Sequence, residues 1–198
     1  MHPATVTRVL VIINAVIAIL MGLAGSAARG TILFWGGLVP ARLTLALEGQ
    51  VPLPGALFTL FGHMFLHGGA LHLTMNMVVL LAIGRVLEPE LGSRRYLLLY
   101  LLSGLAGGLA EWAWDPLSTT PAVGASGAIS GLIAAQAMLF GRSNRSPLVQ
   151  ALGLGVVWVG LQVLSGAALA GPDLRIAIMA HIGGFFAGLA LARPLARD

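Results

Sequence analysis

The sequence contains no cysteine and no lysine, and only 9% of its 198 residues are charged. Without cysteine, a disulfide-stabilised fold is excluded. Soluble domains carry roughly 25% charged residues, so this chain has too few charges to cover itself with a solvated surface. Apolar residues make up 58% of the chain. This composition also excludes intrinsic disorder, and it predicts helices that cross a lipid bilayer.

The positive charge of the chain comes entirely from arginine, because all 11 basic residues are of this type. They are spread along the sequence and form no basic cluster. Nucleic-acid-binding proteins concentrate positive charge on one face, so we expect no nucleic-acid partner. The arginines are more informative about membrane topology.

Long apolar windows predict an all-α membrane protein with a bundle of six transmembrane helices in a single domain, residues 1–198. The predicted spans are about 7–27, 63–86, 95–114, 122–141, 148–170 and 175–193. The first apolar run is longer than the core of a signal peptide, so we expect it to be retained. The segment of about 29–55 is too interrupted by glycine, proline and charge to cross the bilayer. We expect it to lie in the outer interface.

Arginine counts predict the orientation, since cytoplasmic segments are enriched in positive charge. With a cytoplasmic N-terminus, the inner segments hold Arg8, Arg85, Arg94, Arg95, Arg142, Arg145, Arg193 and Arg197. The outer segments then hold only Arg29, Arg42 and Arg175. We therefore expect a multi-pass protein with both termini in the cytoplasm. The compact size favours a prokaryotic cytoplasmic membrane.

Three of the predicted spans carry polar residues, which are costly at membrane depth and mark candidate functional sites. They are His63, His67, His72 and Asn76 in 63–86, Ser126 in 122–141 and His181 in 175–193. At about 1.5 Å per residue, His72, Ser126 and His181 lie roughly 18–24 Å above the nearest inner arginines. The three side chains therefore share one level in the outer half of the membrane.

Glycines predict that two of these spans approach each other closely. His181, Gly184 and Gly188 share one helical stripe, and Gly127 and Gly131 form a small-residue groove around Ser126. Glycines at this spacing are explained equally well by ordinary helix packing without a functional site. A lone GxxxG pattern is a weak signal. Together with the polar residues, they predict that the serine and histidine side chains can touch.

A serine hydroxyl becomes nucleophilic when a histidine removes its proton, so we expect Ser126 to be the nucleophile and His181 the base. His72 and Asn76 lie four residues apart on one helical face and can donate hydrogen bonds to an oxyanion. Glu111 and Asp115 are expected near the outer end of 95–114. Because no carboxylate is expected within a span at this depth, we predict a Ser-His dyad. Considered singly, Ser126 fits the role of a small packing residue, and each histidine fits that of a hydrogen-bonded residue of the core. Their shared level is what favours the catalytic interpretation.

Four segments resemble motifs of the rhomboid family of intramembrane serine proteases. They are HGGALHLTMN at 67–76, EPELG at 88–92, GASG at 124–127 and AHIGGFFAG at 180–188. The six spans resemble the compact prokaryotic form of the family, and the resemblance covers nearly the whole chain.

The resemblance implies a serine endopeptidase that cuts single-pass transmembrane proteins near the outer membrane surface. It implies Ser126 as nucleophile, His181 as base, and His72 and Asn76 as oxyanion donors. It further implies transmembrane-helix substrates in the bilayer, no metal and no organic cofactor, and a mobile gate formed by 148–170 and the outer loop after it.

Two positions depart from the pattern of the family. Many members end the first loop with a Trp-Arg pair, where this chain has Phe58-Thr59. Many also place an aromatic residue four positions after the nucleophile, where it stacks on the catalytic histidine, and here that position is Ser130. Another contact must orient His181 and anchor the loop.

Two alternative functions remain open. The first is a non-catalytic rhomboid-like protein that binds transmembrane helices without cutting them, against which Ser126 and His181 argue. The second is a metal-dependent membrane protein, because His63 and His67 have a metal-ligand spacing. The sequence has no His-Glu-x-x-His motif, so we expect these two histidines to bond backbone groups near the start of 63–86.

Overall fold

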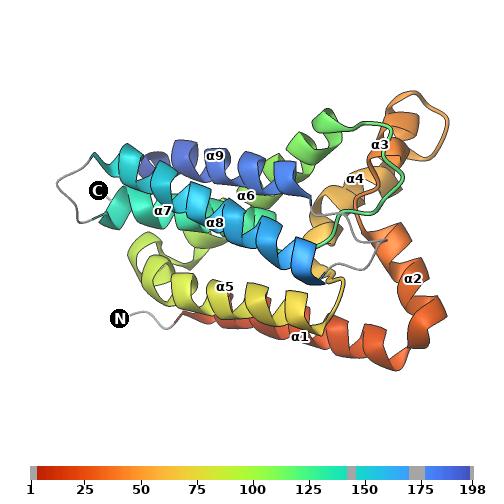
Figure 1. Cartoon of the computed structure of the whole chain (residues 1–198), viewed down its shortest axis with the longest axis horizontal. Helices are drawn as coiled ribbons and strands as arrows, with labels where there is room; N and C mark the ends of the chain where they lie inside the picture. The colour runs from red at the N-terminus through yellow and green to blue at the C-terminus, as the bar shows by residue number, and fades with distance from the viewer. Residues whose placement is uncertain (1–3, 142–145, 170–176, 197–198) are drawn as a thin grey trace.

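The computed structural model describes residues 4–141, 146–169 and 177–196. Over these ranges the chain forms nine α-helices, one short 3-10 helix and an isolated β-bridge, which confirms the all-α fold class. The elements are α1 (Thr5–Leu23), α2 (Gly25–Gly36), α3 (Pro40–Leu47), α4 (Leu53–Gly62), η1 (His63–Phe65), α5 (Ala70–Leu91), α6 (Ser93–Trp114), α7 (Ser126–Phe140), α8 (Pro147–Leu169) and α9 (Ile178–Leu195) (Figure 1).

Each predicted span overlaps one long helix: α1, α5, α6, α7, α8 and α9, in that order. By length and composition, α1, α5, α6 and α9 can each cross a membrane. In contrast, α7 has 15 residues, or about 22 Å at 1.5 Å per residue. This length is shorter than the roughly 30 Å hydrocarbon core of a bilayer. Helix α7 therefore cannot extend from one surface of that core to the other.

The predicted boundaries of two spans are wrong at their outer ends. The helix expected from residue 63 begins at Ala70, because Gly68 and Gly69 follow η1 and interrupt the helical path. The helix expected from residue 122 begins at Ser126, after an extended connection that starts at Asp115. His63 and His67 therefore precede α5, and Ser126 is the first residue of α7.

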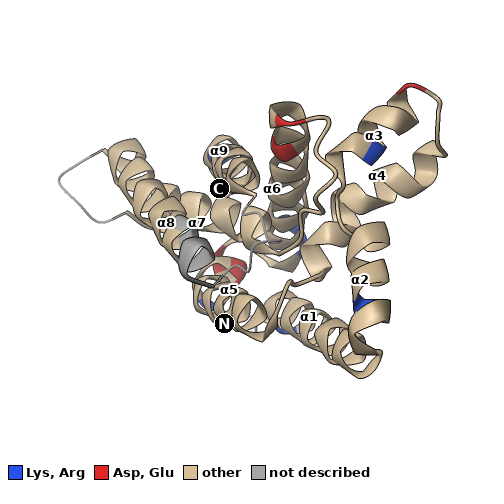
Figure 2. Cartoon of the chain, turned by 45° about the vertical axis from the view of Figure 1, so that its right-hand side comes forward, with Lys and Arg blue, Asp and Glu red and all other residues tan. Residues whose placement is uncertain are grey.

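The surface of the bundle is that of an integral membrane protein. Large apolar side chains are exposed along α1 and α8, including Ile12, Leu23, Val156 and Leu164, and most of the ribbon carries no charge (Figure 2). The start of α1 and the end of α9 lie at the same end of the bundle (Figure 1). Four arginines used in the orientation count (Arg142, Arg145, Arg175 and Arg197) lie outside the described residues. Which side is cytoplasmic stays a prediction.

Glycine contacts hold α7 against α9, as the stripe of small residues predicted. A Cβ added at Gly184 would collide with the carbonyl oxygen of Gly127, and one at Gly188 would collide with that of Gly131. The two backbones therefore touch without intervening side chains. The hydrophobic core beside this contact is formed mainly by α5, α6 and α7 and includes Leu80, Leu99, Tyr100, Ile129 and Leu132.

A buried carboxylate joins α1, α5 and α6 at the opposite end from Ser126. Glu88, only 1% exposed, accepts hydrogen bonds from the backbone amides of Val6 and Thr7 and from the hydroxyls of Thr7 and Ser93. Four donors satisfy the two carboxylate oxygens, which offsets the cost of burying the charge. The sequence motif singled out Glu88 but gave no indication of these partners.

The segment of 29–55 forms short helices held by one arginine. Arg42, on α3, donates hydrogen bonds to the carbonyl oxygens of Phe34, Trp35 and Gly37 at the end of α2. Its guanidinium also lies over the rings of Phe34 and Trp35. Thr59, in contrast, donates to Ala56 in its own helix. Arg42 thus ties α3 to the end of α2.

The same segment is joined to the connection that leads into α7. Leu38 and Ala122 form an antiparallel bridge with backbone hydrogen bonds of 3.0 and 2.8 Å. The Thr44 hydroxyl donates to the carbonyl of Pro116 and accepts from the indole of Trp112. The segment of 29–55 therefore helps to set the path of the chain towards Ser126.

Candidate active site

Ser126 begins α7 because the preceding residues turn sharply into the helix. Gly124 has φ of +129°, a conformation that side chains rarely adopt, and its amide donates a 2.9 Å hydrogen bond to the carbonyl of His63. A Cβ on Gly124 would also lie 2.9 Å from the ring of His72. Glycine is therefore required here both by the backbone and by the close approach of His72.

The structure brings together Ser126 on α7 and His181 on α9. The Nε2 atom of His181 lies 2.7 Å from the Oγ atom of Ser126, which is a short hydrogen bond. Both side chains are buried, with exposed fractions of 6% and 3%. The pair sits one turn from the Gly127–Gly184 backbone contact, so the closeness of the helices allows two short side chains to meet.

His72 and Asn76 lie on the neighbouring face of α5. The ring of His72 faces Gly124, two residues before Ser126. The Nδ2 atom of Asn76 donates to the carbonyl oxygen of His72 at 2.8 Å, and its Oδ1 atom has no hydrogen-bond partner among the described residues. One hydrogen of the Asn76 amide is thus occupied within the helix, and its second hydrogen is the one that could serve an oxyanion.

The expected backbone bonding of His67 is wrong. This side chain is buried, and within the described part of the chain neither ring nitrogen has a hydrogen-bond partner. Burial, and to a smaller extent the nearby His72, lower the pKa of His67 below the usual value for histidine. The ring of His63 instead lies beside the backbone of Gly104 and Leu60.

Among residues 4–141, 146–169 and 177–196, no group of three His, Asp or Glu side chains is placed to hold a metal ion.

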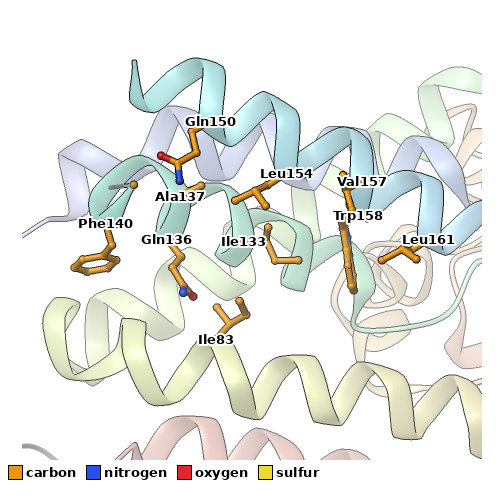
Figure 3. A pocket seen from close by; sticks show the side chains of 11 residues that line it. Ile83, Ile133, Gln136, Ala137, Phe140, Gln150, Leu154, Val157, Trp158 and Leu161 are labelled. Atoms are coloured by element: carbon orange, nitrogen blue, oxygen red, sulfur yellow. The ribbon is translucent and has the colours of Figure 1, made fainter. Parts of the chain in front are cut away.

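Ser130 links the nucleophile helix to α8, a contact that the sequence did not indicate. Its hydroxyl donates to the carbonyl of Ser126 and accepts a hydrogen bond from the indole of Trp158, each at 2.7 Å. Trp158 projects from α8 towards α7 in Figure 3. An aromatic side chain therefore does reach this level of α7, but from another helix.

Glu111 lies closer to the site than the sequence suggested. Its Oε2 atom accepts a 3.2 Å hydrogen bond from the backbone amide of Ala180, the residue before His181. Glu111 lies in the last turn of α6, where the sequence placed it, and the fold brings this end of α6 beside the first turn of α9.

A cavity of about 400 Å³ lies between α5, α7 and α8 (Figure 3). Its lining is mostly apolar and includes Ile83, Ile133 and Leu154, with Gln136 and Gln150 as polar groups. Neither Ser126 nor His181 lines it. The cavity follows the half of α7 that is farther from Ser126.

The arrangement has the elements needed for nucleophilic catalysis. An imidazole nitrogen is placed to take the proton of the Ser126 hydroxyl. Ser126 also begins a helix, where unpaired amides and the helix dipole favour developing negative charge. Together these groups can generate an alkoxide and stabilise a tetrahedral adduct.

Comparison with known proteins yields consistent matches. The sequence profile of the Rhomboid domain matches residues 54–198. The chain is 34% identical over 152 residues to Rhomboid protease GluP of Bacillus subtilis, covering 76% of this chain and 29% of that protein. It is 36% identical over 146 residues to RHOMBOID-like protein 5 of Arabidopsis thaliana (74% and 46%) and 31% identical over 154 residues to Rhomboid-type serine protease 2 of Emericella nidulans (74% and 28%). The chain thus spans less than half the length of each of these relatives.

Proposed function

The chain belongs to the rhomboid family, and we propose that it is an intramembrane serine endopeptidase that uses a Ser126-His181 dyad. The observation that carries this proposal is the 2.7 Å contact between His181 Nε2 and Ser126 Oγ in a buried site. The names of two relatives, a rhomboid protease and a rhomboid-type serine protease, agree with it.

In the proposed reaction, the Ser126 oxygen attacks the scissile carbonyl carbon while its proton passes to His181 Nε2. The tetrahedral adduct collapses when the C–N bond breaks and His181 gives the proton to the leaving amine. A water molecule then attacks the acyl-enzyme, with His181 again as base. This step releases the new carboxylate and restores the Ser126 hydroxyl.

We assign stabilisation of the oxyanion to three donors. These are the backbone amide of Ser126, the ring of His72, and the Asn76 hydrogen that is not bonded to the carbonyl of His72. The contact between His72 and Gly124 supports this role, because it holds the imidazole next to the nucleophile loop. Losing one such donor typically slows catalysis about 10²–10³-fold.

We propose that the substrates are single-pass transmembrane proteins cut near the outer membrane surface. A transmembrane substrate suits a buried nucleophile at the start of α7. The apolar cavity between α5, α7 and α8 would offer contact to the part of a substrate helix that lies deeper in the bilayer. Entry would then occur between α5 and α8, with α8 as the moving element.

The decisive experiment is cleavage of a single-pass model substrate by the purified chain in liposomes. We expect wild-type protein to cut, and Ser126→Ala and His181→Ala to lose activity. Ser26→Ala is the matched control, because this exposed serine lies on α2, outside the helices that carry the proposed site and substrate entry. Labelling by a fluorophosphonate should require Ser126. A wild-type chain that binds the substrate without cutting it would favour the non-catalytic alternative.

We also propose that both termini face the cytoplasm of a prokaryotic cell. Because the chain has no cysteine, a single introduced thiol is a unique topological label. Glu48→Cys and Arg94→Cys place thiols at exposed positions on opposite sides of the proposed topology. An impermeant maleimide added to intact spheroplasts should label the first variant only. Labelling of only the second would reverse the assigned orientation.

A further inference from the structure

The helix that carries His181 begins without a cap of its own. The residue before α9 is Ala177, which provides no side-chain hydrogen bond, and the first turn contains no acidic residue. First-turn amides require acceptors from elsewhere, and helix ends are the least stable part of a helix. His181 lies within this first part of α9, so its position depends on contacts from other helices.

Those contacts converge on Ala180. Its amide bonds the carbonyl of Ala177 at 3.1 Å and the Oε2 atom of Glu111 at 3.2 Å. Its carbonyl oxygen fits against two glycines, since an added Cβ would lie 2.5 Å away at Gly107 and 3.1 Å away at Gly127. The peptide group that joins Ala180 to His181 is therefore enclosed by α6 and α7.

Glu111 and Gly107 act from the same face of α6, because residues four apart in a helix lie one above the other. Gly107 provides the space for the Ala180 carbonyl, and Glu111 provides an acceptor for its amide. An anionic acceptor also interacts favourably with the positive end of a helix. The contact combines a hydrogen bond with an electrostatic attraction, and both hold the start of α9.

We propose that Glu111 is a positioning residue for His181. Its carboxylate fixes the first turn of α9 so that Nε2 stays within hydrogen-bond distance of Ser126. Glu111 does not touch the reacting atoms in this role. The inference rests on the proposed protease function, and it assigns to α6 a part in catalysis that the Ser-His dyad alone does not require.

The test compares Glu111→Ala, Glu111→Gln and Glu111→Asp in the full-length protein in liposomes. The readouts are kcat and KM with the model substrate, the rate constant for fluorophosphonate labelling of Ser126, and the thermal midpoint of unfolding. Glutamine keeps an acceptor oxygen at the same reach, whereas aspartate keeps the charge but withdraws the oxygen by about one methylene. Asp115→Asn is the control for loss of charge at the same end of α6.

We expect Glu111→Ala to lower kcat and the labelling rate about 10- to 100-fold with little change in KM, since misplacement by about 1 Å can have this effect. Glu111→Gln should recover most of the rate, and Glu111→Asp should recover less. If Glu111→Ala does not fold, the glutamine and aspartate variants decide the question, because each weakens one part of the contact. Wild-type kcat in Glu111→Ala, or wild-type kcat and labelling rate in both of the other variants, would overturn the proposal. A wild-type protein that neither cuts nor reacts with the probe would instead overturn the protease function.

Discussion

Gly184→Ala places a methyl group directly between the two helices that carry the proposed dyad. The added Cβ would lie 2.7 Å from the carbonyl carbon of Gly127 and 3.1 Å from the carbonyl oxygen of Ser103. Carbon atoms in ordinary contact are about 3.5–4.0 Å apart. Relief of the clash therefore requires α9 to retreat from α7 by about 1 Å.

This retreat would act directly on the site, because His181 lies one turn before Gly184 on the same stripe of α9. A hydrogen bond of 2.7 Å would lengthen to about 3.7 Å, beyond the usual limit. We expect kcat to fall about 100-fold or more. The overpacked contact should also lower the free energy of unfolding by about 1–3 kcal/mol.

The assay is cleavage of a single-pass substrate in liposomes, together with thermal unfolding in detergent. Gly153→Ala on α8 is the matched control, because an added Cβ there meets nothing within 4 Å. The Gly153→Ala variant should keep wild-type activity, and alanine should slightly stabilise α8 because its helix propensity is higher than that of glycine. A folded Gly184→Ala protein with wild-type kcat would refute the link between close helix packing and catalysis.

Three further changes test other contacts. Glu88→Ala should lower the free energy of unfolding by about 3–5 kcal/mol, because four donors lose their acceptor; a loss below about 1 kcal/mol in denaturant titration would contradict this. Trp158→Phe and Ser130→Ala should show a coupling of about 0.5–1.5 kcal/mol in a double-mutant cycle, and additive effects would exclude a net contribution from their hydrogen bond. Cleavage should decline only in strong acid, because protonated His181 cannot accept the serine proton and burial disfavours its charged form; an unchanged rate down to about pH 3 would argue against a histidine base.

Sequence patterns predicted the parts of this fold that depend on composition and short-range spacing. Apolar runs indicated all six long helices, and the stripe from His181 to Gly188 predicted the contact between α9 and α7. Both signals depend on residues within a few turns of one another. The shared depth of the polar residues and the glycines around Ser126 indicated this serine as one partner of the contact, and the resemblance to rhomboid motifs agrees.

Contacts between residues distant in sequence could not be predicted in this way. Nothing local to Ser130 indicates that Trp158 reaches it, and nothing near Glu111 indicates the amide of Ala180. The start of α5 was missed because apolar character continues through the two glycines at which the helix is interrupted. A hydropathy window averages the apolar character of consecutive residues. It does not detect where the backbone leaves the helical path.

The bridge between Leu38 and Ala122 has a consequence for engineering smaller variants. The Rhomboid domain profile begins at residue 54, and a fragment trimmed to that boundary would retain every proposed catalytic side chain. It would lose Leu38, whose backbone hydrogen bonds with Ala122 hold the connection that leads to Ser126. A fragment that begins there would keep the proposed catalytic side chains without the backbone contact that holds the connection before them, so a smaller version of this protein should retain Leu38 and the residues after it.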